Sequence, residues 1–288
     1  MRRLACCRHP ILHEPAPMNF TTLKIELDGP VARLLLNRPD KANAMSEAMW
    51  AELPQAAAWL NTQKQVRVVI LAGSGKHFTA GIDLEVLAGL SQRVLGPGCP
   101  ARAREYLRDW ILGAQATMTA IENIRVPVIA AITGACVGAG VDMIAACDLR
   151  YATADAKFCI KEVDLAVVAD VGTVQRLQPI IGYGRVAELT YTAETFDGNK
   201  AERIGLVNGV FTTSEALMAH VETLARELAA KSPITVRGVK KSLLYSRDHT
   251  VAEGLEFVAG WNAAMLISAD IQEAVGAYLQ KRKPTFAD

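Results

Sequence analysis

The sequence lacks several features that mark common classes of protein. Its 288 residues carry 31 basic and 30 acidic side chains, so a net charge of +1 supplies no field that would draw the chain to nucleic acid or to an anionic membrane. No apolar run approaches the roughly 20 residues that a membrane-spanning helix needs. These absences predict a protein with no nucleic-acid partner and no membrane segment.

The cysteines and histidines form no recognisable ligand or disulfide pattern. No C-x-x-C pair occurs among the six cysteines, four of which stand in or beside apolar or Gly-rich stretches, as expected of reduced thiols. A reducing compartment, and hence a cytoplasmic location, is the prediction. Only His9 and His13 stand four residues apart, and Pro10 and Pro15 disfavour a helix through them. We therefore expect no metal site.

Motifs for nucleotide binding and for a nucleophile are also absent. Gly182-Tyr183-Gly184-Arg185-Val186-Ala187 fits the loose pattern G-x-G-x-x-A, but Pro179 precedes it where a clear strand should stand, which favours a turn between helices. Lys76 lacks the flanking residues of a phosphate-binding P-loop. No G-x-S-x-G elbow exists, and Cys136 has no adjacent partner to activate it.

The chain divides into three parts. Residues 1–17 contain Arg2, Arg3 and Arg8 without the apolar run of a secretory signal, and we interpret them as a disordered leader or a misassigned start. The alternative is a mitochondrial transit peptide, which would make the location mitochondrial. Residues 18–213 read as an α/β body, and residues 214–288 as helices.

Strand and helix patterns alternate along the body. Two strands joined by Asp28-Gly29-Pro30 predict an opening hairpin, and Ser46 is placed to cap the first helix. Glu162 is expected to end a strand, and Asp170 to close an apolar run over Val163–Ala169. The predicted strands are Leu23–Leu27, Val31–Asn37, Val66–Ala72, Pro127–Thr133, Asp148–Ala152, Lys157–Glu162 and Leu206–Phe211.

Two small-residue loops are candidates for binding an oxygen atom. One loop ends at Ala80-Gly81, and the other is the turn Gly138-Ala139-Gly140. Each stands where the chain enters a helix, so unpaired backbone N–H groups can point at a ligand. Tight packing is the alternative role of each loop. Two such amides aimed at one carbonyl oxygen would form an oxyanion hole.

Three acids stand near these loops or in apolar surroundings: Asp142, Glu162 and Asp170. A lone buried carboxylate often caps a helix or forms a salt bridge. Three together beside two amide loops favour proton transfer by paired carboxylates.

These residues belong to a larger set of ordered motifs. The motifs are Asn37-Arg38-Pro39 with Lys41-Ala42-Asn43-Ala44-Met45, Phe78-Thr79-Ala80-Gly81-Ile82-Asp83, Gly138-Ala139-Gly140, Ala146-Cys147-Asp148, Gly172-Thr173-Val174-Gln175-Arg176-Leu177 and Lys281-Arg282-Lys283-Pro284. Over Leu23–Phe286 the sequence resembles the enoyl-CoA hydratase/isomerase (crotonase) family. The resemblance implies a spiral of ββα units, with residues 214–288 building a homotrimer or a homohexamer.

The resemblance also implies roles for the two loops. The amides of Ala80 and Ala139 would hold the carbonyl oxygen of an acyl-CoA thioester, although most members have Gly where this chain has Ala139. The implied CoA-binding residues are Lys41, Ala42, Ala80, Gly81, Ile82, Asp83 and Gly138, with Lys281 reaching the CoA of a neighbour. CoA enters as part of the substrate, so no separate cofactor is expected.

The acids indicate a branch of the family. Hydratases typically have Glu at the positions of Asp142 and Glu162 and Gly at Asp170, whereas this trio resembles the Δ3,5-Δ2,4-dienoyl-CoA isomerases of fatty acid β-oxidation. The resemblance implies that Glu162 removes a proton from carbon 2, Asp170 protonates carbon 6 and Asp142 tunes the pair. The alternatives are an enoyl-CoA hydratase and a non-catalytic relative that binds acyl-CoA or RNA.

Overall fold

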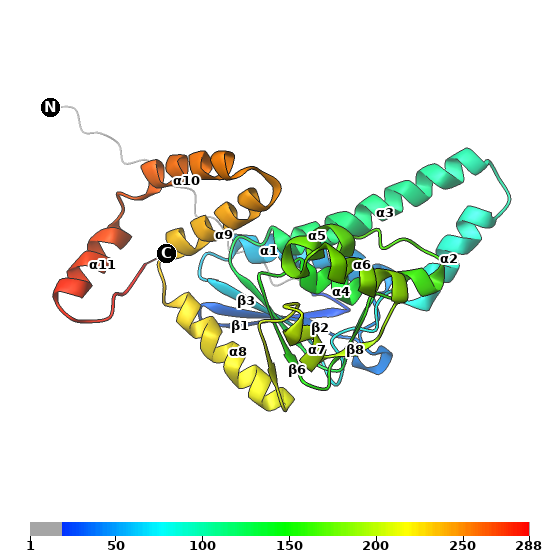
Figure 1. Cartoon of the computed structure of the whole chain (residues 1–288), viewed down its shortest axis with the longest axis horizontal. Coiled ribbons are helices and arrows are strands. Elements are labelled where there is room, and N and C mark those ends of the chain that lie inside the picture. Colours follow the sequence, from blue (N-terminus) through cyan, green and yellow to red (C-terminus); the bar gives the residue numbers. More distant parts are fainter. Residues whose placement is uncertain (1–18, 288) are drawn as a thin grey trace.

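In the computed structural model, which describes residues 19–287, a six-stranded sheet runs through the centre of the body (Figure 1). The strand order is β1-β2-β3-β4-β6-β9. Only β1 and β2 pair antiparallel, and the other neighbours are parallel, so helical crossovers connect them. The strands are β1 Leu23–Asp28, β2 Val31–Leu36, β3 Val68–Gly73, β4 Val128–Ile132, β6 Leu149–Thr153 and β9 Gly209–Phe211.

A second, three-stranded sheet stands beside the first. Its order is β5-β7-β8, formed by Ala135–Val137, Lys157–Cys159 and Phe196–Asp197. Two 3-10 turns occur at η1 Pro39–Lys41 and η2 Glu162–Leu165.

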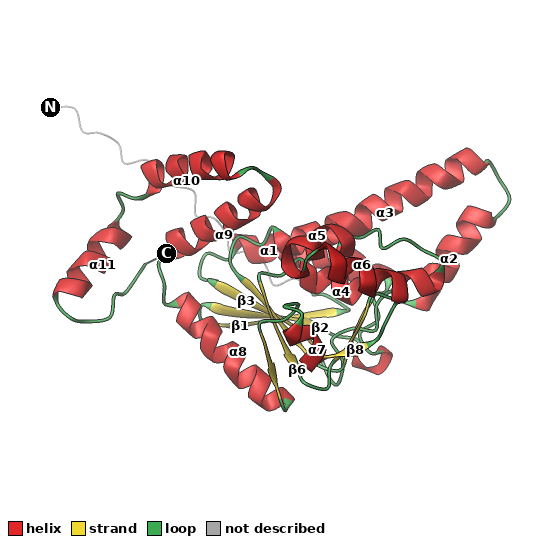
Figure 2. Cartoon of the chain, in the orientation of Figure 1, coloured by secondary structure: helices red, strands yellow, loops and turns green. Residues whose placement is uncertain are grey.

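Helices cover both faces of the large sheet (Figure 2). Leu53 and Met118 of α1 and α3 pack in the main core, whereas Leu217 and Val221 of α8 pack on the opposite face. The helices are α1 Glu47–Thr62, α2 Leu84–Leu95, α3 Pro100–Glu122, α4 Ala139–Ala145, α5 Thr173–Ile181, α6 Tyr183–Thr192, α7 Gly198–Arg203, α8 Ser214–Ala229, α9 Pro233–Asp248, α10 Val251–Met265 and α11 Ala269–Leu279.

Local sequence signals account for several element boundaries. Ser46 caps α1 as predicted, and its hydroxyl accepts from the N–H of Met49. Gly182, at φ +80°, separates α5 from α6, which confirms the predicted turn between helices. The predicted hairpin is confirmed, since β1 pairs with β2 through Asp28 and Val31.

Two local predictions are wrong. Strand β7 ends at Cys159, so Glu162 begins the η2 turn instead of ending a strand. The apolar run before Asp170 is not buried in the single chain, because the side chains of Val163 and Leu165 are 44% and 47% exposed and that of Val168 is 79% exposed. Asp170 therefore owes its environment to other neighbours.

The last three helices project from the body (Figure 1). Lys240 of α9 anchors them, since its ammonium donates to Asp148 at 2.7 Å and to the carbonyl of Val126 at 3.1 Å. Arg67 donates to the carbonyl of Phe286 at 2.7 Å and ties the chain end back to the body. Helix α8 packs on the central sheet, and the division of the chain at residue 213 stays a prediction.

We predict that Leu71→Ala lowers the free energy of unfolding by about 2–5 kcal/mol, because Leu71 of β3 is fully buried and its loss leaves a cavity. Urea titration measures the change. The control is Leu84→Ala, since Leu84 is 74% exposed and its loss is expected to cost less than about 0.5 kcal/mol. Equal effects of the two substitutions would contradict this assignment of the core.

Candidate active site

The two small-residue loops lie side by side. Thr79 and Cys136 form an isolated parallel bridge, in which Thr79 N–H donates to Ala135 O at 2.9 Å and Val137 N–H donates to Thr79 O at 3.2 Å. At Gly81, with φ +93°, an added Cβ would stand 2.7 Å from Val137 O and 3.8 Å from Ala139 N. The backbone therefore brings Ala80-Gly81 next to the amide of Ala139.

The two predicted oxyanion donors differ in their surroundings. Ala139 is the first residue of α4, and the first N–H groups of a helix have no partner within it. The N–H of Ala80 donates to the carbonyl of Ala42 at 2.9 Å, so the prediction that this amide is unpaired is wrong. A thioester oxygen would have to share or displace the Ala42 carbonyl.

Glu162 lies against the turn that opens α4. Gly138 adopts φ +51°, and a Cβ added there would stand 3.3 Å from Oε1 of Glu162. The N–H of Gly138 donates to the carbonyl of Cys159 at 2.9 Å, which fixes the turn to the end of β7. The carboxyl group of Glu162 and the amide of Ala139 therefore share one small region.

Asp142, one turn into α4, is held by Thr173 at the start of α5. Both the N–H and the hydroxyl of Thr173 donate to its Oδ1 at 2.6 Å, and Asp142 is 1% exposed. Burial raises the pKa of Asp142 to about 6, against the opposing effect of these hydrogen bonds. Asp170 raises this pKa further, so the two carboxylates interact.

The three acids form one electrostatic group. Burial raises the pKa of Glu162 to about 7, and the charges of Asp142 and Asp170 act in the same direction. Its Oε2 is buried without a hydrogen-bond partner, which leaves that atom free to bind a proton. Burial also raises the pKa of Asp170. The prediction that Asp142, Glu162 and Asp170 lie close enough to interact agrees with these shared effects.

Asp170 borders a cavity that neither Asp142 nor Glu162 lines. This cavity of about 320 Å³ is lined by Asp170 and Arg176 together with side chains of α3 and α9. Gln115 of α3 donates from Nε2 to the backbone carbonyl of Asp170 at 2.7 Å. Neither Gln115 nor Thr173 was identified from the sequence as a site residue, although Gly172-Thr173 was visible as part of a motif.

Most of the predicted CoA-binding residues are fixed around the first loop. Arg38 donates to the carboxylate of Asp83 at 2.8 Å, and Asp83 also caps α2 by accepting from Glu85 N–H at 3.1 Å. An isolated bridge between Met45 and Ile82 holds the segment that follows Lys41 and Ala42 against this loop.

Asn43 and Lys281 also bear on the predicted CoA-binding residues. Asn43, fully buried, donates to the carbonyls of Ser74 and His77 and was not identified from the sequence as a site residue. Lys281 follows α11 in the projecting helices and is exposed, apart from the rest of the set within one chain.

Neither a metal site nor a membrane segment stands out in residues 19–287. No group of three His, Cys, Asp or Glu side chains within that range is arranged to hold a metal ion. No helix in the same part of the chain has both the length and the apolar character required to span a bilayer.

The model of a known family, Enoyl-CoA hydratase/isomerase, matches residues 26–288. The chain belongs to the enoyl-CoA hydratase/isomerase family. The resemblance predicted from the motifs is thus confirmed, and so is the crotonase-like fold, since solved members of the enoyl-CoA hydratase/isomerase family superpose on the chain. An enoyl-CoA hydratase from Bacillus anthracis has TM-score 0.83 at 30% identity, covering 92% of this chain and 98% of its own. A putative enoyl-CoA hydratase from Streptomyces coelicolor A3(2) has TM-score 0.86 at 28% identity, covering 97% and 99%.

Curated members of the enoyl-CoA hydratase/isomerase family are more similar in sequence. The peroxisomal Delta(3,5)-Delta(2,4)-dienoyl-CoA isomerase of Arabidopsis thaliana is 48% identical over 93% of this chain and 98% of its own length. The mitochondrial Delta(3,5)-Delta(2,4)-dienoyl-CoA isomerase of Mus musculus is 45% identical over 88% of this chain and 77% of its own.

We predict that Glu162→Gln stabilises the protein at alkaline pH relative to the wild type. The folded state holds a proton on Glu162 up to a pKa of about 7, against 4.5 for an unperturbed Glu, so the wild type loses stability as the pH rises between these values. From pH 5 to pH 8 the advantage of the variant should grow by about 1–3 kcal/mol. Urea titrations at both values measure it, with the exposed Glu188→Gln as control. If the free energy of unfolding depended on pH in the same way for the wild type and Glu162→Gln, burial of Glu162 would not be raising its pKa.

Proposed function

We propose that this enzyme isomerises 3,5-dienoyl-CoA to 2,4-dienoyl-CoA. The observation that carries the proposal is the electrostatic group of Asp142, Glu162 and Asp170 beside the turn at Ala139. Two relatives at 48% and 45% identity carry the name of this activity and support it. The step belongs to the β-oxidation of unsaturated fatty acids.

The thioester carbonyl is assigned to the amides of Ala80 and Ala139. Hydrogen bonds from both donors would stabilise the negative charge that develops on this oxygen when carbon 2 loses a proton. Binding would replace the Ala42 carbonyl at the N–H of Ala80, so the loop exchanges one acceptor for another. The CoA moiety is assigned to Lys41, Ala42, Gly81, Ile82, Asp83 and Gly138, and no further cofactor is needed.

Glu162 is assigned as the base. Its unpartnered Oε2 and a pKa of about 7 give a carboxylate that accepts a proton readily near neutral pH. Removal of the proton from carbon 2 leaves a conjugated dienolate, with its electrons spread from the thioester oxygen to carbon 6. The position of Glu162 against Gly138 keeps the base next to the polarised carbonyl.

Asp170 is assigned as the acid that protonates carbon 6. Burial raises the pKa of this carboxyl above its ordinary value, the direction of change that suits a proton donor. The proton count balances, since Glu162 gains one proton and Asp170 loses one while the two double bonds shift along the chain. Asp142, with Oδ1 held by Thr173, contributes negative charge that raises the pKa of Glu162.

Hydration of a 2-enoyl-CoA is less favoured by the geometry. A hydratase needs two carboxylates that can both hold the attacking water. In this chain Oδ1 of Asp142 already accepts two hydrogen bonds from Thr173, and the side chain is almost fully buried. Glu162 therefore lacks a second carboxylate that is open to water at that position.

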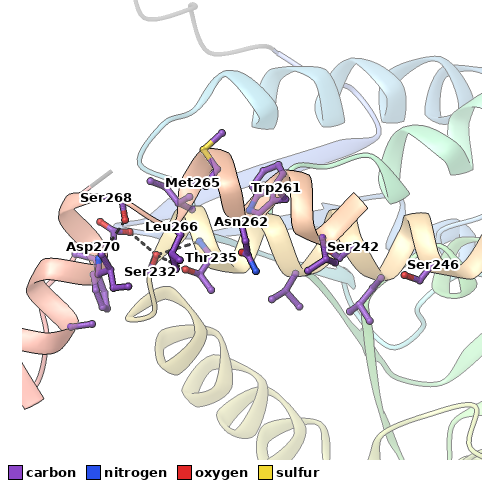
Figure 3. A pocket seen from close by; sticks show the side chains of 17 residues that line it. Ser232, Thr235, Ser242, Ser246, Trp261, Asn262, Met265, Leu266, Ser268 and Asp270 are labelled. Carbon is purple, nitrogen blue, oxygen red and sulfur yellow. Dashed lines mark hydrogen bonds between the residues drawn. The ribbon is translucent and has the colours of Figure 1, made fainter. Parts of the chain in front are cut away.

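We propose that the enzyme assembles as a homotrimer or as a homohexamer through α9–α11. These helices enclose a largely apolar cavity of about 560 Å³ (Figure 3). Ile267 is 91% exposed and Leu279 is 75% exposed in one chain. Exposed apolar side chains of this kind are unfavourable in water and mark surfaces that contact another protein. In such an assembly Lys281 would reach the CoA of a neighbour. Light scattering tests this by giving three or six times the mass of one chain.

The location of the enzyme stays a prediction. The named relatives are peroxisomal and mitochondrial, and neither name supports the cytoplasm that the cysteine pattern indicates. The alternative of a mitochondrial leader concerns residues 1–17, which lie outside the described residues.

We predict that Asp170→Asn lowers kcat for 3,5-dienoyl-CoA by about 10²–10⁴-fold, because an amide does not donate a proton to carbon 6. The rise in absorbance of the conjugated 2,4-dienoyl thioester measures turnover. Asp164→Asn is the matched control, since Asp164 lies in the same segment but pairs with Lys161 on the surface. Wild-type turnover by Asp170→Asn, or hydration of crotonyl-CoA that outpaces isomerisation in the wild type, would refute the proposed function.

A further inference from the structure

Side chains from α3 and from the start of α5 contact the backbone that follows Asp170. Gln115 donates to the carbonyl of Asp170 at 2.7 Å, and Arg176 donates to that of Val171 at 3.4 Å. At Gly172, with φ +130°, an added Cβ would stand 1.9 Å from Nη1 of Arg176. The guanidinium of Arg176 therefore fills the space that a side chain at residue 172 would occupy.

Arg176 is itself held by α3. Its Nε donates to Oε1 of Glu122 at 3.1 Å, and its Nη2 donates to the hydroxyl of Thr119 at 3.0 Å. Glu122 is only 8% exposed, yet despite the opposing effect of burial its contacts with Arg247 and Arg176 lower its pKa. Gln115, Thr119 and Glu122 follow helical spacing, so they lie on one face of α3.

Helix α9 closes this network from the other side. Arg247 donates from Nη1 to Oε1 of Glu122 at 2.5 Å, so Glu122 stands between two guanidinium groups. Arg176 and Arg247 also line the cavity that borders Asp170. One face of α3 and two arginines therefore hold the backbone that carries the proposed acid.

We propose that Gln115 and Arg176 are positioning residues that hold Asp170 at the distance from Glu162 that protonation of carbon 6 requires. This inference rests on the proposed function, because it concerns only the second of the two proton transfers. A displacement of about 1 Å at a reacting group can cost about 10²-fold in rate. Gln115 and Arg176 bind two consecutive carbonyls, those of Asp170 and Val171, directly after the Cα of Asp170 and resist such a displacement.

The two proton transfers can be measured separately. In D2O, exchange of the carbon 2 protons of a bound acyl-CoA requires Glu162 and the oxyanion donors but not Asp170. Complete isomerisation requires all three. Asp170→Asn is the reference variant for a defect in the second transfer alone: we expect it to retain exchange at carbon 2 and to lose isomerisation.

Gln115→Met keeps the length of the side chain and removes the donor. We expect its kcat for isomerisation to fall by about 10-fold or more, with KM within about 2-fold and carbon 2 exchange at the wild-type rate. Gln178→Met on α5 is the control, since Gln178 is exposed and bonds only within its own helix. Wild-type isomerisation by Gln115→Met, or an equal fall in both rates, would overturn the inference.

Arg176→Lys tests the second contact. Lysine keeps the positive charge but lacks the branched guanidinium group that contacts Val171, Glu122 and Thr119 together. We therefore expect the same result as for Gln115→Met: slower isomerisation with unchanged exchange at carbon 2. The near-UV circular dichroism spectrum shows whether this variant is folded, and the Gln115 variant decides the question if it is not. A wild type that does not isomerise 3,5-dienoyl-CoA would refute the proposed function itself. If the wild type isomerises 3,5-dienoyl-CoA and both Gln115→Met and Arg176→Lys do so at the wild-type rate, only the positioning role is refuted.

Discussion

Burying three carboxyl groups near one another raises the pKa of each of them, and the organisation of the site follows from that cost. Burial is the largest cause at each of the three; the charge of Asp170 also raises the pKa of Asp142, and the charges of Asp142 and Asp170 also raise the pKa of Glu162. Asp142 differs from the other two acids because Thr173 donates two hydrogen bonds to it, which stabilise its charged form. The remaining two acids are then free to hold and release a proton.

The fold supplies this arrangement through a few backbone contacts. The bridge between Thr79 and Cys136 joins the two small-residue loops, and Gly138 leaves room for the carboxyl group of Glu162 beside the amide of Ala139. Asp142 follows one turn later on α4, and α5 begins at the residue that binds it. Isolated buried carboxylates would destabilise the protein, and the rest of the core offsets that cost.

Much of the architecture could be predicted from the sequence because it depends on local signals. Ser46 caps its helix, Asp28-Gly29 turns the first hairpin, and the ordered motifs predicted the family that the comparisons confirm. The charges of Asp142 and Asp170 also affect the pKa of Glu162, as expected of acids that share one site. These features depend on spacing along the chain, which the sequence displays directly.

The remainder depends on contacts between distant segments. The carbonyl of Ala42 meets the N–H of Ala80 across 38 positions of the chain, and no local pattern indicates this. Asp170 closes an apolar run in the sequence, but in one chain Val168 of that run is 79% exposed, because nothing in the described residues covers it. Gln115 and Arg176 carry no motif that points to Asp170, since their role arises from how α3 and α5 pack.

The most direct test of this account is a titration of the carboxyl carbons by ¹³C NMR, with the signal of Glu162 assigned by comparison with a variant that lacks it. The account predicts that Glu162 titrates with a midpoint at about 7 and that Asp142 titrates at about 6. Midpoints for both groups near their ordinary values of about 4 would show that Glu162 and Asp142 are independent, solvated acids, and would contradict the coupling on which the proposed proton transfer rests.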